Sequence, residues 1–157
     1  MSQPPDQVIE AQVDVAISDG YPLPRWGWPT PRTYNGATGE ERVRGWQKVQ
    51  IGKRLGLLTL SPTCDVCASQ SAQGSHTCIY FRPMTTKPVC KSCHFAIHRR
   101  FSDPDKWLER LAHLPAARWV HAIPLVELTR TEALEIAKAF DVFDALAVRR
   151  NRGPVVT

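Results

Sequence analysis

Residues 89–101 read Val-Cys-Lys-Ser-Cys-His-Phe-Ala-Ile-His-Arg-Arg-Phe, and their Cys90 and Cys93 repeat the Cys-x-x-Cys spacing of Cys64 and Cys67. The two pairs are separated by 22 residues. Each pair forms a tight turn that directs two thiolates at one ion, and four thiolates complete the tetrahedral shell that zinc prefers. We therefore predict a structural zinc site. Such a site is coordinatively closed, so it contributes folding free energy, on the order of 10 kcal/mol, rather than chemistry.

His94 and His98 stand four residues apart, which places both imidazoles on one face of a helix, where they can reach a single ion. An alternative assignment of ligands is a zinc finger in which the first cysteine pair binds one ion together with the two histidines. It would need a loop of 26 residues, about twice the usual span, and would leave the second cysteine pair without a metal. The four-cysteine assignment is therefore favoured. The two histidines are then either ligands of another metal or ordinary polar residues near a helix C-terminus.

The positive charge of the chain is concentrated in its middle. Residues 21–101 carry twelve Lys and Arg and three acids, residues 1–20 carry four acids and no base, and residues 102–157 carry eight of each. This distribution favours a polyanionic partner such as double-stranded DNA, the alternative being a solvated basic surface. Four of the five cysteines lie in Cys-x-x-Cys pairs typical of metal binding, and the N-terminus has no signal-peptide features. Both observations predict a cytoplasmic protein. Apolar runs such as Leu55–Leu60 are too short to cross a membrane.

The first 59 residues are predicted to contain one helix. Residues 1–20 are expected to be a flexible arm, because apolar residues are sparse and no cap is visible. Residues 21–59 form a Pro/Trp-rich segment and a basic helix, and in this segment Trp26 and Trp28 are expected to pack on the domain rather than stack on bases. Thr38 and Glu41 match a capping box and predict a helix from about residue 39 to 55. Its basic residues do not form a single stripe.

Residues 102–157 are predicted to be a helical C-terminal region. Pro104 after Asp103 starts a helix that runs to about residue 114, and a second short helix covers about residues 116–122. Residues 131–150 have helical apolar spacing, and the stretch 135–150 faintly matches a helix-turn-helix, but ordinary packed helices are favoured, because any amphipathic pair produces this pattern.

Taken together, the first Cys-x-x-Cys, His76 ahead of Tyr80 and Pro83, and the stretch 89–101 resemble the HNH endonuclease family in its zinc-stapled form. The resemblance covers roughly residues 60–101, about a quarter of the chain. It implies an α+β fold: a small ββα-metal module flanked by α-helices. Strands would lie around residues 77–82 and 87–89 and lead into a helix near residues 92–100.

The resemblance also implies a second metal site and a DNA substrate. A divalent ion such as Mg²⁺ or Mn²⁺ would be held by His76, His94 and His98, which would be the catalytic residues of phosphodiester hydrolysis. The basic side chains around this site would neutralise phosphates; they are Arg82, Lys91, Arg99 and Arg100.

The sequence departs from the family at the general base, where Thr77 stands in place of histidine. A threonine hydroxyl does not ionise near neutral pH, so three interpretations stay open. His76 takes the base role and leaves the metal to His94 and His98, or His113 or His121 supplies a base from the C-terminal helices. Otherwise the module is catalytically degenerate and acts as a DNA- or protein-binding subunit.

Two further alternatives concern the remaining cysteine and the class of nucleic acid. Cys78, close to His76 in sequence, is either a soft metal ligand or a small buried residue. An RNA-binding zinc ribbon also fits the basic charge, but it leaves His94 and His98 unexplained.

Overall fold

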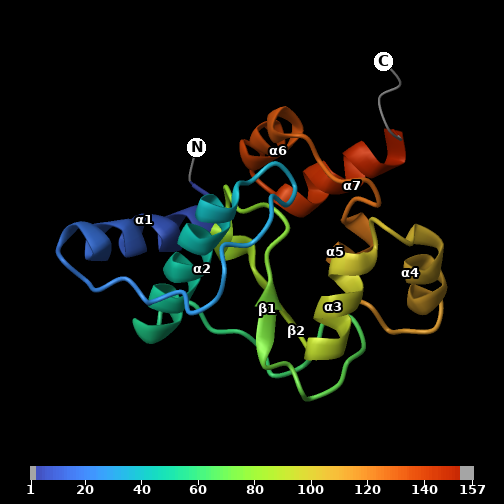
Figure 1. Cartoon of the computed structure of the whole chain (residues 1–157), viewed down its shortest axis with the longest axis horizontal. Coiled ribbons are helices and arrows are strands. Elements are labelled where there is room, and N and C mark those ends of the chain that lie inside the picture. Colours follow the sequence, from blue (N-terminus) through green and yellow to red (C-terminus); the bar gives the residue numbers. More distant parts are fainter. Residues whose placement is uncertain (1–2, 153–157) are drawn as a thin grey trace. The chain divides into compact units, whose positions relative to one another are not determined.

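The computed structural model describes residues 3–152 and contains both helices and a short sheet, compatible with the predicted α+β class (Figure 1). The chain forms two compact units, each assembled from separated segments. Within the described residues, unit 1 consists of 3–59, 77–86 and 128–142, and unit 2 consists of 60–76, 87–127 and 143–152. In the part of the chain that is described, no helix is long and apolar enough to cross a membrane.

The core of unit 1 is built on two helices, α1 (Pro5–Ser18) and α2 (Gly39–Arg54). Val13 of α1 is fully buried against Val49 and Ile51 of α2 and against Met84. The expectation of a flexible arm over residues 1–20 is therefore wrong. Pro4 precedes α1 without a side-chain cap, so the start of the helix is marked in the sequence only by Pro5 at its first position and Asp6 in its first turn.

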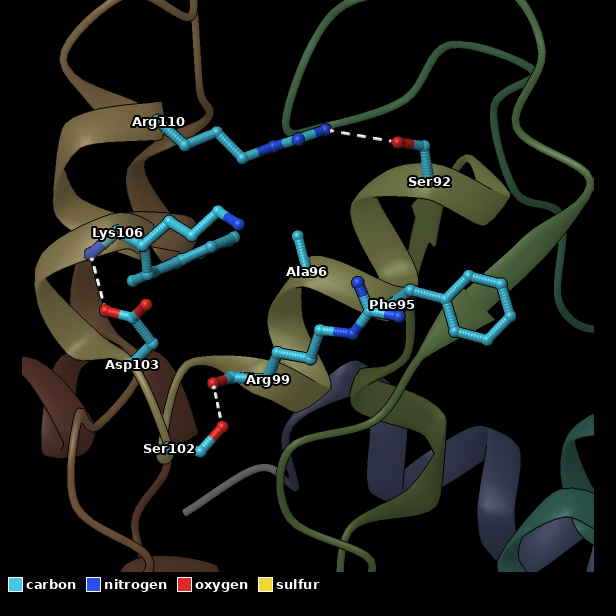
Figure 2. A pocket seen from close by; sticks show the side chains of 9 residues that line it. Ser92, Phe95, Ala96, Arg99, Ser102, Asp103, Lys106 and Arg110 are labelled. Carbon is cyan, nitrogen blue, oxygen red and sulfur yellow. Dashed lines mark hydrogen bonds between the residues drawn. The ribbon is translucent and has the colours of Figure 1, made fainter.

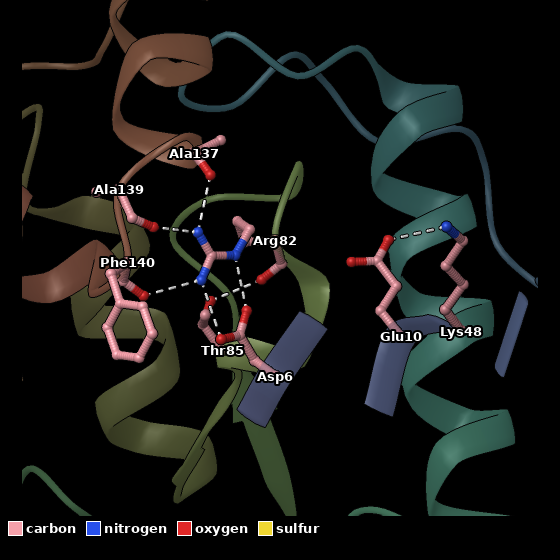
Figure 3. A network of polar contacts seen from close by, with 8 residues as sticks. All are labelled: Asp6, Glu10, Lys48, Arg82, Thr85, Ala137, Ala139 and Phe140. Carbon is pink, nitrogen blue, oxygen red and sulfur yellow. Dashed lines mark hydrogen bonds and ion pairs between the residues drawn. The ribbon is translucent and has the colours of Figure 1, made fainter. Parts of the chain in front are cut away.

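A buried arginine ties α1 to the rest of unit 1 (Figure 3). Arg82 is 2% exposed, and its guanidinium donates two hydrogen bonds to the carboxylate of Asp6, at 2.7 and 3.0 Å. Three further hydrogen bonds reach the carbonyl oxygens of Ala137, Ala139 and Phe140 at 2.6–3.2 Å. These bonds use all five N–H groups of the side chain. Arg82 is therefore a structural residue, and its predicted role in binding phosphate is wrong.

The predicted capping box of α2 is confirmed, and it has a second function. Thr38 Oγ1 accepts from the Glu41 amide at 3.2 Å, and the Glu41 carboxylate accepts from the Thr38 amide at 2.9 Å. The same carboxylate receives two hydrogen bonds from Arg130, at 2.6 and 3.0 Å, at the start of α6 (Arg130–Ala137). The Arg130 bonds, the largest cause, lower the pKa of Glu41 from 4.5 to about 2.

A tight turn at Asn35 and Gly36 closes unit 1 near α6. Both residues have positive φ, 46° and 78°, and Tyr34 and Ala37 exchange backbone hydrogen bonds across them. Positive φ at both central positions is typical of a type I′ turn, which Asn-Gly favours. A Cβ at Gly36 would lie 2.5 Å from the Cα of Arg130, so no other residue fits there.

The Asn35 side chain joins two distant segments of unit 1. It is 1% exposed, its Oδ1 accepts from the Leu128 amide, and its Nδ2 donates to the Cys78 carbonyl, both at 3.1 Å. Cys78 is itself 1% exposed. These contacts support the interpretation of Cys78 as a small buried residue of unit 1.

The two tryptophans of the Pro-rich segment belong to an aromatic cluster with Trp46 of α2. The ring centroids of Trp26 and Trp46 lie 5.2 Å apart, those of Trp26 and Trp28 5.1 Å apart, and all pairs meet edge to face. The predicted packing of the segment is therefore confirmed. Trp28 is 65% exposed, and its stacking on bases stays untested.

Unit 2 contains a two-stranded antiparallel sheet and most of the remaining helices (Figure 1). Strand β1 (Gly74–His76) pairs with β2 (Lys87–Val89), with His76 opposite Lys87. The helices are α3 (Lys91–Arg99), α4 (Pro104–Leu111), α5 (Arg118–Ala122) and α7 (Val142–Arg152), of which only Val142 falls in unit 1.

The sheet and the first helix of unit 2 correspond in part to the predicted ββα order. The strand expected around residues 77–82 is not formed, because the chain turns there through a hydrogen bond from the Arg82 amide to the Ile79 carbonyl into the 3₁₀ helix η1 (Pro83–Thr85). The strand at 87–89, the helix near 92–100 and the start at Pro104 with Asp103 as N-cap are confirmed. The 131–150 region forms α6 and most of α7.

Candidate metal centre

The four cysteines of the two Cys-x-x-Cys pairs converge at one point in unit 2. Their Sγ atoms, from Cys64, Cys67, Cys90 and Cys93, all lie within 4.8 Å of one another. All four are free thiols. Sγ atoms at the corners of a zinc tetrahedron are about 3.8 Å apart, as follows from Zn–S bonds of about 2.3 Å. The 3.9 Å between Cys67 and Cys90 fits this edge, so the cluster could hold a metal such as zinc.

Local backbone geometry accounts for the direction of the thiols. In the first turn, the Ala68 amide donates to the Cys64 carbonyl at 2.9 Å, and Ala68 adopts a φ of 64°. In the second turn, Cys90 is the N-cap of α3, and its Sγ accepts from the Cys93 amide at 3.5 Å. A helix N-terminus stabilises negative charge, so this end of α3 favours thiolates.

Two thiols of the cluster have pKa values shifted in opposite directions. A hydrogen bond from Ser69, the largest cause, lowers the pKa of Cys67 to about 6. Burial raises the pKa of Cys93 to about 12, against a lowering contribution from Arg110, whose Nη2 lies 3.4 Å from the Cys93 Sγ. A metal ion bound by the four sulfurs would deprotonate both thiols. Arg110 was not singled out from the sequence, although it is the cation that contacts this cluster.

A second cluster brings together the three histidines predicted from the family resemblance. His76 comes from the end of β1, and His94 and His98 from one face of α3. Their ligand nitrogens lie within 4.8 Å of one another, and the Nε2 atoms of His94 and His98 are 3.0 Å apart. His76 is 2% exposed, whereas the two helix histidines are half-buried, which leaves the cluster open to solvent on one side.

A tryptophan holds the buried histidine in place. Trp119 of α5 stacks on His76, with ring centroids 6.3 Å apart and planes inclined by 9°. Its indole N–H donates to the carboxylate of Asp65 at 2.8 Å. Asp65 lies between the cysteines of the first pair, and its backbone bonds Pro88 of β2 and Ala117 before α5. The cysteine turn thus positions the ring that covers His76, a connection that no short sequence motif signals.

The predicted phosphate-binding residues divide into two kinds. Lys91 and Arg99 are exposed on α3. Arg100 is 0% exposed and donates to the carbonyls of Pro124 at 2.7 Å and Ile97 at 2.8 Å. Its predicted role in phosphate binding is therefore wrong, because the side chain is inaccessible and two of its N–H groups donate to interior carbonyl oxygens.

None of the other residues considered for the general base lies in the three-histidine cluster of the described structure. Thr77 is 7% exposed and belongs to unit 1. His113 and His121 are exposed in unit 2, and the metal clusters found among residues 3–152 include neither of them. Cys78 also lies outside those clusters.

No protein-family model, no curated protein and no solved structure matches this chain.

Proposed function

We propose that the chain is an HNH-like, metal-dependent endonuclease that hydrolyses phosphodiester bonds in DNA at the three-histidine cluster. The observation that carries this proposal is the convergence of His76, His94 and His98 in unit 2, apart from the four-cysteine cluster. The fold around them, two short antiparallel strands followed by a helix that bears two of the histidines, supports the same assignment.

The two clusters suit different tasks. Four thiolates around one zinc ion leave no coordination position for substrate, so the cysteine cluster is assigned to folding. Three imidazoles leave at least one position open, which is typical of catalytic sites. Trp119 stacks on His76, and His94 and His98 stand one turn apart on α3, so the three rings converge without a bound metal.

The chain itself supplies substrate binding and orientation. A divalent ion held by the three histidines would supply Lewis-acid stabilisation of the scissile phosphate. Lys91 and Arg99 extend into solvent from the helix that carries two of the ligands, and they offer cations for neighbouring phosphates. With His76 as a metal ligand the base would be His113 or His121; otherwise His76 would be the base and the metal would be left to His94 and His98.

A second candidate function is a catalytically degenerate module that binds DNA or protein. Two observations favour it: a buried threonine stands at the general-base position, and Arg82 and Arg100 serve the interior rather than the surface. In this alternative the four cysteines would still bind zinc, and the three histidines would not catalyse a reaction.

The test is cleavage of plasmid and single-stranded DNA with Mg²⁺, Mn²⁺ or Ni²⁺, and with chelator. The proposal predicts metal-stimulated cleavage that His98→Ala abolishes while zinc content is unchanged. Loss in His113→Ala or His121→Ala, with metal binding intact, would assign the base to that residue. Thr77→His should raise the rate, since general-base catalysis is worth roughly 10²–10⁴-fold. DNA binding without cleavage by either wild type or Thr77→His would favour the degenerate module.

A further inference from the structure

A hollow of about 390 Å³ lies between α3 and α4 of unit 2 (Figure 2). Ser92, Phe95 and Arg99 line it from α3, and their spacing places them on one helix face. At 100° per residue, His94 and His98 point more than a quarter-turn away from that face. The hollow is therefore a site distinct from the three-histidine cluster.

The hollow is positively charged. Arg99, Lys106 and Arg110 line it, and Asp103 is the acid on its wall. The Asp103 carboxylate accepts from the Lys106 amide at 3.1 Å and so caps α4. Among the ion pairs of residues 3–152, none involves any of the three cations. In Figure 2 the Lys106 and Arg110 side chains extend from α4 towards α3.

Two buried N–H donors belong to residues on the wall of this hollow. Trp107 is 2% exposed, and its indole Nε1 has no acceptor within the described part of the chain. The Nε of Arg110 is likewise buried without an acceptor there, although its Nη2 lies 3.4 Å from Ser92 Oγ. Both atoms are inaccessible to solvent, so they belong to the packed wall behind the hollow, and the accessible cations Arg99 and Lys106 are the groups that a ligand can reach.

We propose that this hollow binds a nucleotide through its phosphate, with Arg99 and Lys106 as the charged contacts. The volume lies in the range of small-molecule sites and exceeds what a phosphate group alone requires. Phe95, 52% exposed at the rim, offers a ring on which a base can stack. The nucleotide is either free or part of a strand. The inference does not depend on hydrolysis, because occupancy is measured without cleavage.

Arg110 has a second partner and is therefore a poor probe. Its Nη2 also contacts the Cys93 sulfur, so replacing it would disturb the metal cluster. Arg99 and Lys106 are exposed and contact neither metal cluster in the described structure, which makes them suitable positions for substitution. Arg118 is the matched control: it is an exposed arginine of unit 2, its side chain is 91% accessible, and it lies outside the hollow.

The experiment follows the five tryptophan indole N–H resonances of the ¹⁵N-labelled full chain, with that of Trp107 assigned by Trp107→Phe. Millimolar dAMP should shift the Trp107 resonance, and deoxyadenosine, which lacks the phosphate, should not. Arg99→Gln and Lys106→Gln should each weaken dAMP binding about tenfold, the usual effect of losing one charge-assisted hydrogen bond, and Arg118→Gln should not. His98→Ala should respond as wild type does.

A 5′-phosphorylated single strand of about eight nucleotides distinguishes the two sources. The same indole shift with tighter binding than dAMP assigns the site to a strand, and weaker or absent binding of the strand assigns it to a free nucleotide. Equal shifts with dAMP and deoxyadenosine, or unchanged affinity in both Gln variants, would overturn the proposal. No Trp107 shift with any of these ligands would do the same.

Discussion

Asp6→Asn removes the charge that faces the buried guanidinium of Arg82 while keeping the size of the side chain. Two of the five hydrogen bonds of Arg82 end on the Asp6 carboxylate, and the other three end on neutral carbonyls. With Arg82 2% exposed, water cannot replace the lost partner. Leaving a buried charge uncompensated costs about 3–5 kcal/mol.

This cost should appear as a lower thermal midpoint for unit 1. At about 2–4 °C per kcal/mol for a chain of this size, the expected decrease is roughly 6–20 °C. Calorimetry or circular dichroism of the full chain measures it. The loss should include α1, so amide exchange in residues 5–18 should become faster.

Asp14→Asn is the matched control on the same helix. Its carboxylate pairs with Lys48 at 3.0 Å, but the side chain is 51% exposed and Lys48 keeps Glu10 as a partner. The expected cost is about 0–1 kcal/mol, typical of surface ion pairs. If Asp6→Asn destabilises the protein no more than Asp14→Asn does, Arg82 is not held as described and the account of α1 fails.

Three further predictions concern the metal cluster, the capping box and the two kinds of arginine. Cys90→Ser should lower zinc content to a small fraction of that of wild type and unfold residues 60–76 and 87–100, since such sites contribute on the order of 10 kcal/mol; full zinc by elemental analysis would refute this. The lowered pKa of Glu41 means that its contribution to stability is complete above about pH 4.5 and is lost as the pH falls towards about 2. Glu41→Gln removes this titrating carboxylate, so the free energy of unfolding should decrease less between about pH 4.5 and about pH 2, by about 1 kcal/mol after solvent screening of the Arg130 pair. An unchanged pH dependence of stability over that range would count against the pair. Arg99→Gln should reduce the slope of log K for duplex DNA against log salt by about 1, whereas Arg100→Met should lower stability instead; equal effects on binding would contradict their assigned positions.

Local signals in the sequence predicted local structure well. The Thr38 capping box, the Asp103–Pro104 start and the His94–His98 spacing each depend on residues within four positions, and each is present in the structure. The grouping of four cysteines also followed from spacing, because each Cys-x-x-Cys turn has few conformations.

Features that depend on distant partners were missed or misassigned. Helix α1 has no cap, and it is tied down through Asp6 by an arginine 76 positions away. Arg82 and Arg100 were expected on the surface because arginine is rarely buried, and only the surrounding carbonyl oxygens explain their burial. The stacking of Trp119 on His76 likewise joins residues that no motif relates.

We propose that the four-cysteine and three-histidine clusters of unit 2 bind metal independently, and titration of the zinc-loaded protein with Mn²⁺ measures this independence. Calorimetry, with zinc measured before and after, should show one Mn²⁺ bound by wild type while zinc stays at about one per chain. His98→Ala should keep its zinc and bind no Mn²⁺, because that change removes one ligand of the open site only. If wild type binds no second ion, or if His98→Ala loses zinc together with Mn²⁺, the histidines do not form an independent metal site.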